Sequence, residues 1–295
     1  MSDFRLKVFQ SVAKNLSFTK ASQELFVSQP AITKHIQELE ATYQTRLFDR
    51  QGSKISLTES GRLLLEHCER ILEDYKRLEY EMHLLHNEYI GELKLGASTT
   101  IAQYVLPPLL GSFIGKFPQV NLSLLNGNSR EIEAALQEHR IDLGLVEGVF
   151  RLPNLKYTTF LEDELVAVVH SKSRLQLPEE ITPQDLPAIP LVLRERGSGT
   201  LDVIERSLQK HGVKLSSLHV LMYLGSTESI KLFLENSDCM GIVSIRSICK
   251  ELAAGTFRVV EIKDMPMLRD FCFVQLHGQE GGLSQAFMNY MFMSR

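Results

Sequence analysis

Residues 17–50 read SFTKASQELFVSQPAITKHIQELEATYQTRLFDR, and this stretch decides the fold of the N-terminal region. In its second half, apolar residues recur at the spacing of one helical face, and four of them are expected to point inward: Ile32, Ile36, Leu39 and Tyr43. The opposite face is short, polar and weakly basic, and consists of Pro30, Thr33, Lys34 and Gln37. The spacing therefore predicts an amphipathic helix with one polar face turned to solvent.

The start of this helix is marked by Ser28 and Pro30. Ser28 is a good N-cap, and a proline is tolerated in the first turn because the backbone N–H groups there have no helical partner. The preceding segment has Ser17 or Thr19 as its own cap, and only a short link separates the two helices. This predicts a helix-turn-helix, whose second helix enters the major groove of DNA by its N-terminal end. A small three-helix domain that does not bind DNA shows the same spacing and is the alternative.

The residues after this helix predict a two-stranded wing. Leu47 and Phe48 are expected to close the core, while Gly52 permits a turn between two short strands. The turn would carry Arg50 and Lys54 to an exposed rim, where cations meet phosphate or the minor groove. The N-terminal region is therefore predicted to be a winged helix-turn-helix.

The chemistry of the side chains suggests their roles on DNA. Gln29 suits adenine and Lys34 suits guanine, because each can reach the hydrogen-bonding groups of that base in the major groove. Thr33 and Pro30 offer apolar contact to thymine methyl groups, and Ser17, with Thr19 and the two wing cations, is assigned to the sugar-phosphate backbone. The full predicted DNA-binding set is Ser17, Thr19, Ser28, Gln29, Pro30, Thr33, Lys34, Arg50 and Lys54.

The distribution of charge supports double-stranded DNA as the partner of this region. The whole chain of 295 residues has a formal net charge of −4, which would be odd for a DNA-binding protein if it were spread evenly. Residues 1–65 hold nine Lys or Arg against six Asp or Glu, whereas the other 230 residues hold 23 basic against 30 acidic. The positive charge therefore gathers where the phosphates are expected.

A long helix is predicted from residue 59 to about Tyr89, with Thr58 as its cap. Apolar residues follow a heptad repeat along it, and the predicted dimerisation set is Leu64, Cys68, Ile71, Tyr75, Leu78, Met82 and Leu85. The residues between them are mostly charged, so the apolar stripe needs a partner. We expect the same helix of a second chain, in a homodimer or a homotetramer. Packing of the stripe on the chain's own C-terminal region is the alternative.

After Gly91 the pattern changes to alternating strands and helices, which predicts a parallel α/β sheet. The expected order is strand 92–96, helix 101–117, strand 120–125, helix 130–139 and strand 141–146, then a second α/β unit that begins with strand 162–170, and a return strand at 271–276. The predicted domains are a winged helix-turn-helix at 1–58, a dimerisation helix at 59–90 and an effector-binding domain at 91–295, with lobe I at 91–161 and 265–295 and lobe II at 162–264.

The motif SFTKASQELFVSQPAITKHIQELE, followed by LFDR and SLTESG, resembles the N-terminal signature of the LysR-type transcriptional regulators. This resemblance implies an α+β multidomain protein whose C-terminal part is a two-lobed, periplasmic-binding-protein-like effector domain. It also implies pairing through the long helix and contact with RNA polymerase. The segments ASTTIAQYVLP, GNSREIEAAL and LGLVEG look closest to the branch that includes the sulfur-metabolism regulators CysB and CysL.

Hydroxyl residues occur at four junctions where a helix follows a strand, and ligands of parallel sheets bind beyond such strand ends. These residues are Ser98, Thr99, Thr100, Ser129, Ser198, Thr200, Ser226 and Thr227, although each also suits an ordinary helix cap. The family resemblance implies a cleft between the lobes lined by residues 98–100, the strand end near Glu147 and residues 198–200. Hydroxyls and helix N-termini suit a small anion or carboxylate. Arg194 and Arg196 either add charge to this site or lie on the surface of their loop.

The sequence does not favour the other classes of protein. GxSxG, HExxH, P-loop and GxGxxG patterns are absent, so no enzyme is indicated, and Ser198 between two glycines suits a cap better than a nucleophile. The four cysteines lack CxxC spacing, so neither a metal site nor a disulfide is expected, and oxidant sensing by Cys239 with Cys249 is an alternative. Without a secretory segment or a long apolar run, the protein is expected to be cytoplasmic and not to bind membranes. The rival interpretation is a solute-binding or enzymatic α/β protein with an accessory DNA-binding domain.

Overall fold

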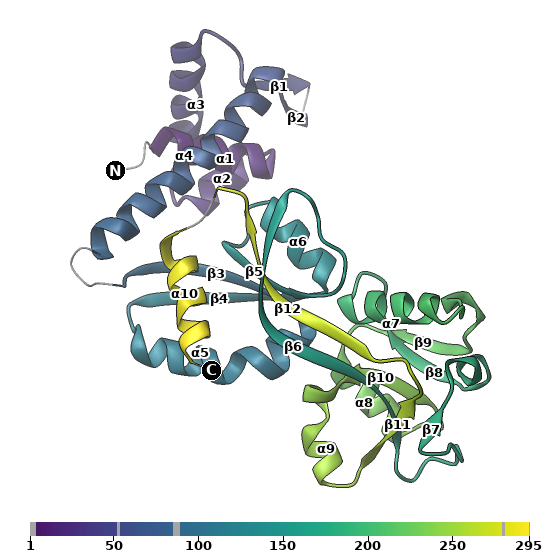
Figure 1. The fold of residues 1–295 in the computed structure, drawn as a ribbon. Helices are drawn as coiled ribbons and strands as arrows, with labels where there is room; N and C mark the ends of the chain where they lie inside the picture. Colours follow the sequence, from purple (N-terminus) through teal and green to yellow (C-terminus); the bar gives the residue numbers. More distant parts are fainter. Residues whose placement is uncertain (1–3, 52–53, 85–88, 279–280, 295) are drawn as a thin grey trace. The chain divides into compact units, whose positions relative to one another are not determined.

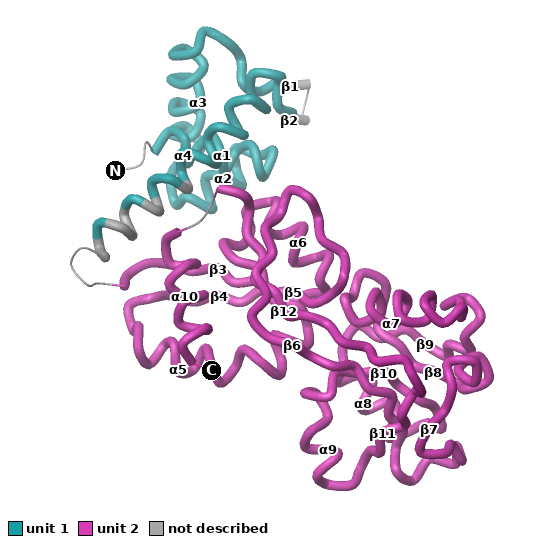
Figure 2. Tube along the Cα trace, in the orientation of Figure 1, with its two compact units in different colours: residues 1–88 teal, residues 89–295 magenta. Residues whose placement is uncertain are grey.

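A computed structural model describes residues 4–51, 54–84, 89–278 and 281–294, and the chain divides into two compact units (Figures 1 and 2). Unit 1 comprises residues 1–88 and unit 2 comprises residues 89–295. None of the described helices is long and apolar enough to cross a membrane.

Unit 1 is the predicted winged helix-turn-helix followed by a long helix (Figure 1). Its elements are α1 (Phe4–Asn15), α2 (Phe18–Glu24), α3 (Gln29–Tyr43), β1 (Phe48–Gln51), β2 (Lys54–Leu57) and α4 (Glu59–Leu84). The two strands pair antiparallel, with Phe48 opposite Leu57 and Gln51 opposite Lys54. The predicted wing hairpin is therefore confirmed, and the turn at Gly52 lies outside the described residues.

The core of unit 1 confirms most of the predicted inward face. Ile32, Ile36 and Leu39 of α3 are buried together with Leu47 and Phe48, as expected. Tyr43 is exposed instead, because it is the last residue of α3 and extends past the packed part of the helix.

The start of α4 depends on two residues, Thr58 and Gly61. The hydroxyl of Thr58 accepts a hydrogen bond from the backbone N–H of Gly61 at 2.9 Å, so Thr58 caps the helix as predicted. A Cβ at Gly61 would overlap the backbone carbonyl of Leu47, so only glycine lets the first turn of α4 approach the residue that precedes β1.

Unit 2 begins with the predicted parallel α/β sheet. Its first elements are β3 (Gly91–Ser98), a π-helical turn (Ile101–Val105), α5 (Leu106–Lys116), β4 (Val120–Gly127), α6 (Ser129–Gln137) and β5 (Leu143–Glu147). Strand β3 lies between β4 and β5 and is parallel to both. The π-helical turn stands immediately before α5, in which Pro107 and Pro108 lack the N–H groups that regular helical bonding requires.

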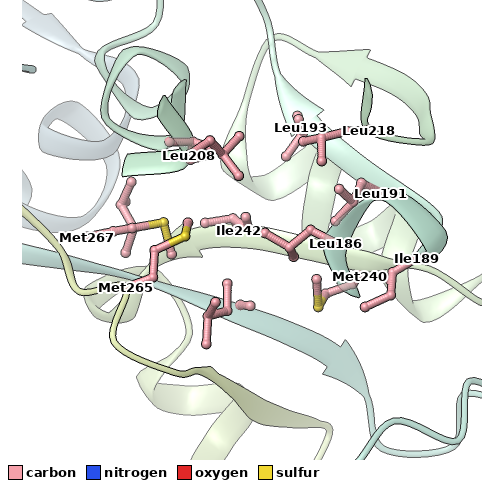
Figure 3. Close-up of a cluster of buried hydrophobic side chains, with 14 of the residues drawn as sticks. Leu186, Ile189, Leu191, Leu193, Leu208, Leu218, Met240, Ile242, Met265 and Met267 are labelled. Carbon is pink, nitrogen blue, oxygen red and sulfur yellow. The ribbon is translucent and has the colours of Figure 1, made fainter. Parts of the chain in front are cut away.

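The second half of unit 2 adds another parallel set, with β8 between β9 and β10. Its elements are β6 (Leu155–His170), β7 (Glu180–Ile181), 3-10 helices (Pro183–Ala188, Leu215–Ser217, Ile245–Ser247), β8 (Leu191–Arg194), α7 (Gly199–Lys210), β9 (Val220–Leu224), α8 (Thr227–Glu235), β10 (Met240–Ser244), α9 (Cys249–Ala253), β11 (Phe257–Ile262), β12 (Met267–Leu276) and α10 (Gly282–Met293). Strands β7 and β8 were not predicted from the sequence. Figure 3 shows the apolar cluster that packs this half, with Leu191 and Leu193 of β8 beside Met240 and Ile242 of β10.

Two long antiparallel strands, β6 and β12, run side by side from one half of unit 2 to the other (Figure 1). Both are longer than the predicted strands, because each passes between the lobes without a break. Their pairing shifts where Phe271 faces Leu161 and Cys272 faces Thr159, which leaves Phe160 as the extra residue of a bulge. The bulge lies at the predicted crossing near Leu161.

Candidate functional site

The first candidate site is the N-terminal end of α3, and its backbone is capped as predicted. The hydroxyl of Ser28 accepts a hydrogen bond from the N–H of Ala31 at 3.4 Å, and Pro30 stands in the first turn. The hydroxyl of Ser17 does the same for Lys20 at 3.2 Å and so begins α2. Both helices of the helix-turn-helix thus start where the sequence predicts.

The polar face predicted for α3 is turned to solvent. Ser28, Gln29, Pro30 and Lys34 are exposed, and Thr33 is half-buried. The hydroxyl of Thr19 on α2 donates to Oε1 of Gln29 at 3.4 Å, and the hydroxyl of Thr33 donates to the Gln29 carbonyl at 3.1 Å. The side chain of Gln29 is therefore held between the two helices at the point where α3 begins.

For the wing, the structure describes the pairing of the two strands. Residues Arg50 and Lys54 belong to β1 and β2, with Arg50 opposite Ile55 across the hairpin. Their side chains lie outside the described part of the structure. Their assignment to the DNA backbone therefore stays a prediction.

The predicted dimerisation stripe on α4 divides into two parts. Cys68 is buried in the core of unit 1, where its thiol donates to the Leu6 carbonyl at 3.3 Å, and burial raises its pKa to about 12. Leu64 packs against the same core. Cys68 is thus unavailable to a second chain, and its assignment to the dimer interface is wrong, because α4 first covers its own domain.

The core extends along α4 to Leu72, and other residues of the predicted stripe lie outside it. Ile71, Leu78 and Met82 are exposed, and Tyr75 is half-buried. Leu85 lies outside the described residues. Tyr89, expected at the end of the same helix, belongs to unit 2, where its ring packs against Phe117 with 4.5 Å between centroids.

The second candidate site, in unit 2, is built on a buried arginine that the sequence analysis missed. Arg269 of β12 forms an ion pair with Asp163 of β6, with 2.7 Å between Nη2 and Oδ2. It also approaches Glu147 of β5, with 3.5 Å between Nη1 and Oε1. All three side chains are buried. Asp163 accepts a further hydrogen bond from the Ser244 hydroxyl at 2.7 Å, so its charge is matched on two sides.

Glu147 accepts hydrogen bonds from two hydroxyls that were predicted to bind an effector. The Ser98 hydroxyl donates to Oε2 of Glu147, and the Thr100 hydroxyl donates to Oε1 at 3.4 Å. Burial raises the pKa of this carboxyl, although the Arg269 charge acts in the opposite direction. Ser98, Thr100 and Glu147 therefore meet as predicted, but they bind one another.

The start of α7 is packed against the end of β5. Ser198 caps α7 by accepting a hydrogen bond from Leu201 N–H at 3.2 Å, and the Thr200 hydroxyl accepts from Nη1 of Arg269 at 2.9 Å. A Cβ at Gly199 would overlap the backbone carbonyl of Glu147. The same carbonyl accepts a hydrogen bond from the Ser129 hydroxyl at 2.7 Å. Serine and threonine residues from three separate junctions thus converge on Glu147 and Arg269.

Arg194, at the end of β8, forms a second buried polar centre. Its Nε and Nη2 donate to the carboxylate of Glu195 at 2.8 and 3.0 Å. Nη2 also donates to the Thr99 hydroxyl at 3.3 Å and to the Gly225 carbonyl at 3.2 Å, just before α8 and Thr227. Arg194 is therefore no surface residue, whereas Arg196 is exposed.

A signal for the missed residues Asp163 and Arg269 was present in the strand alternation. Asp163 shares a face with Leu165 and Ala167, and these three residues are buried along β6. Arg269 lies between buried Met267 and Phe271 with the same period of two. Opposite charges on the inward faces of two strands indicate a buried ion pair, but only the pairing of β6 with β12 brings them together.

No group of His, Cys, Asp or Glu that could hold a metal ion occurs among the described residues. Cys239 and Cys272 are buried and Cys249 is exposed, and burial raises the pKa of the two buried thiols. The structure describes all four cysteines as free thiols.

Comparison with known proteins identifies both parts of the chain. Residues 4–62 match the family model described as "Bacterial regulatory helix-turn-helix protein, lysR family", and residues 86–292 match "LysR substrate binding domain". The HTH-type transcriptional regulator YeiE of Escherichia coli is 32% identical over 287 residues, covering 97% of this chain and 94% of YeiE. The regulator CysL of Bacillus subtilis is 29% identical over 269 residues, covering 91% of this chain and 89% of CysL.

A solved structure adds a ligand-bound relative. The regulatory domain of CcmR from Synechocystis PCC6803, in complex with 2-PG, is 28% identical and superimposes with a TM-score of 0.62. The match covers 69% of this chain and 97% of that domain.

Proposed function

Because the chain belongs to the LysR family of bacterial transcriptional regulators, we propose a division of roles among its residues. The protein is a DNA-binding transcriptional regulator with an effector-binding domain. The observation that carries the proposal is the capped, solvent-facing start of α3 within the helix-turn-helix. The residues assigned to DNA are Ser17, Thr19, Ser28, Gln29, Pro30, Thr33, Lys34, Arg50 and Lys54.

Gln29 and Lys34 are the base-reading residues of this proposal. Both are exposed near the N-terminal end of α3, and that end enters the major groove in helix-turn-helix proteins. The Thr19 hydroxyl holds the Gln29 side chain by its oxygen, so its orientation is restricted before DNA binds. Ser17, Thr19 and the wing cations bind the sugar-phosphate backbone.

The DNA-binding role is tested by selecting duplexes from a random-sequence pool with the full-length protein. The affinity of the selected duplex is then compared with that of a scrambled duplex by fluorescence anisotropy. We expect the selected duplex to bind at least tenfold more tightly. Equal affinity for both duplexes would contradict sequence-specific reading.

We propose that two chains pair through the second part of α4, where Ile71, Leu78 and Met82 are exposed on a helix whose first part covers its own domain. Tyr75 and Leu85 complete the proposed interface. Pairing places two α3 helices on one DNA site, which raises affinity and sets the spacing of the half-sites. The same proposal includes the pairing of dimers into tetramers and contact with RNA polymerase. It also includes a cytoplasmic location and the absence of catalytic activity.

The proposed effector is a small anion bound by unit 2. CcmR, whose regulatory domain was solved with 2-PG, supports a small-molecule ligand for this domain. The predicted residues are Ser98, Thr99, Thr100, Ser129, Glu147, Ser198, Thr200 and Thr227. The buried guanidinium of Arg194 beside Thr99 supports an anionic ligand over a cationic one.

The effector role is tested by adding sulfate, phosphate or small carboxylates to the complex of the full-length protein with its selected duplex. We expect at least one anion to change affinity or the length of the nuclease footprint, and Thr100→Val to weaken that response. Potassium chloride at equal ionic strength serves as the control. A response identical in the chloride control, or unaltered by Thr100→Val, would place the effector elsewhere.

A further inference from the structure

The guanidinium group of Arg194 has one side without a partner. The side chain is only 1% exposed and is the largest of the fully buried side chains. Nε and Nη2 are occupied by Glu195, Thr99 and Gly225, as described above. Among the residues that the structure describes, Nη1 has no hydrogen-bond partner. Leaving a buried, charged donor without a partner is unfavourable, so a molecule that supplies an acceptor there stabilises the folded protein.

Two helix N-termini flank the guanidinium. Thr99, which accepts from Nη2, opens the helical segment that continues into α5. Gly225, whose carbonyl also accepts from Nη2, precedes Ser226, the N-cap of the nine-residue helix α8. Helix N-termini carry unpaired N–H groups and partial positive charge, which adds to the charge of Arg194.

Negative charge near Arg194 is already engaged. Glu195 pairs with the Nε and Nη2 edge of the guanidinium, so its carboxylate does not occupy Nη1. Glu228, in the first turn of α8, accepts hydrogen bonds from the Tyr104 hydroxyl and from Nζ of Lys231, the latter at 2.9 Å. The direction at Nη1 therefore favours an acceptor with negative charge.

The other buried centre is already paired: Nη2 of Arg269 also has no hydrogen-bond partner among the described residues, but it lies 2.7 Å from Oδ2 of Asp163 in an ion pair. The hydroxyls of Ser98 and Thr100 already donate to Glu147, and Arg269 is shared between Glu147 and Asp163. A ligand anion placed there would stand beside a buried carboxyl and compete with it for the same donors.

We propose that Arg194 is the anion-binding residue of the effector site, with Nη1 donating to one oxyanion group of the ligand between Thr99 and the N-terminus of α8. The oxyanion is a carboxylate, phosphate or sulfate group of a small molecule. This inference deepens the effector role proposed above and rests on it. Arg194 both joins Thr99 to the α8 region and binds the ligand, so ligand binding and the contact between those segments depend on the same side chain.

Binding of inorganic phosphate, sulfate and acetate to the full-length protein tests the inference by isothermal titration calorimetry at constant ionic strength. Acetamide is the neutral analogue of acetate. We expect at least one oxyanion to bind, acetamide to bind at least tenfold more weakly than acetate, and Arg194→Gln to abolish binding. Arg196→Gln is the matched control, because it removes the same charge from an exposed position two residues away.

Circular dichroism establishes whether Arg194→Gln folds. If it does not fold, Arg194→Lys replaces it. Lysine keeps the positive charge but lacks the planar set of N–H donors of a guanidinium, so anion binding should weaken at least tenfold. Unchanged binding in either folded Arg194 variant overturns the inference, as does equal loss in Arg196→Gln or equal binding of acetamide and acetate. If Arg194→Gln binds anions normally while Thr100→Val does not, the effector role stands and only the assignment to Arg194 fails.

Discussion

The start of α3 and the centre of unit 2 use polar residues in opposite ways. At α3, Gln29 and Lys34 are exposed to solvent, so a partner can reach their side chains even though the Gln29 amide oxygen accepts a hydrogen bond from Thr19. In unit 2, Glu147 and Arg269 are buried, and their groups are occupied by hydroxyls and by each other. A surface that reads DNA exchanges water for base edges, whereas a buried centre must be satisfied before any ligand arrives.

This difference predicts where substitutions affect stability and where they affect binding alone. Residues of the buried centre hold strands β6, β12 and β5 together, so their loss should reduce the free energy of unfolding. The exposed residues of α3, such as Gln29 and Lys34, contribute little to the core, so their loss should leave folding intact and reduce only DNA affinity.

The largest effect is expected for Arg269→Gln. The change leaves Asp163 and Glu147 buried without their cation, and breaking a buried pair in this way costs about 3–5 kcal/mol. Urea unfolding followed by circular dichroism measures it. Arg246→Gln is the matched control, because Arg246 is 42% exposed and lies 3.6 Å from Asp163, so its loss should cost no more than about 1 kcal/mol. Equal losses of unfolding free energy in the two variants would mean that the burial of Arg269 does not make its ion pairs more important for stability.

A smaller loss of stability is expected for Gly199→Ala. Its Cβ would overlap the Glu147 carbonyl, so α7 or β5 must move, at a cost of about 1–3 kcal/mol. Gly111→Ala in α5 is the opposite case, because nothing lies near the added Cβ and alanine favours a helix by roughly 0.5–1 kcal/mol. Thermal unfolding should therefore shift in opposite directions, and a shift in the same direction would refute the close approach of α7 to β5.

Gln29→Ala should affect binding without affecting folding. Losing one base contact is expected to reduce affinity for the selected duplex by about 1–3 kcal/mol and to relax the choice at one base pair. Gln37→Ala, on the same exposed face but two turns from the N-terminal end, should cost less. Anisotropy titrations with single-substituted duplexes measure both. A change in the unfolding midpoint of Gln29→Ala would contradict the separation of roles.

The smallest effect is expected for Lys54→Ala in the wing. A cation that binds phosphate weakens all sequences alike when it is removed, and the slope of log affinity against log salt should fall by about one. Titrations at several salt concentrations with the selected and the scrambled duplex test this. A loss confined to the selected duplex would move Lys54 to the base-reading residues.

The sequence predicted unit 1 well because its elements are set by local patterns. Ser28 and Pro30 mark the start of α3, and the period of Ile32, Ile36 and Leu39 marks its buried face. The heptad pattern in α4 was equally clear, but it could not show that Cys68 faces α1 while Ile71 faces outward. That depends on how much of α4 its own domain covers.

Unit 2 was predicted as alternating strands and helices, but its site was only partly foreseen. Hydroxyls at strand ends indicated Ser98, Thr100 and Thr200, while the charges that they bind lie on β5 and β12, far apart along the chain. Strand β8 was missed because its four residues are too few to show a period.

By itself, the sequence determined the helix-turn-helix, the wing, the long helix and the α/β alternation, because capping residues and hydrophobic periods act over a few neighbouring residues. Only the tertiary structure decided which charges are buried together. Arg269 meets Asp163 across a strand pair, and Arg194 meets Thr99 over 95 positions of the chain. Strand pairing and the free-energy cost of burying an unpaired charge determine such contacts, and local residue spacing predicts neither of them.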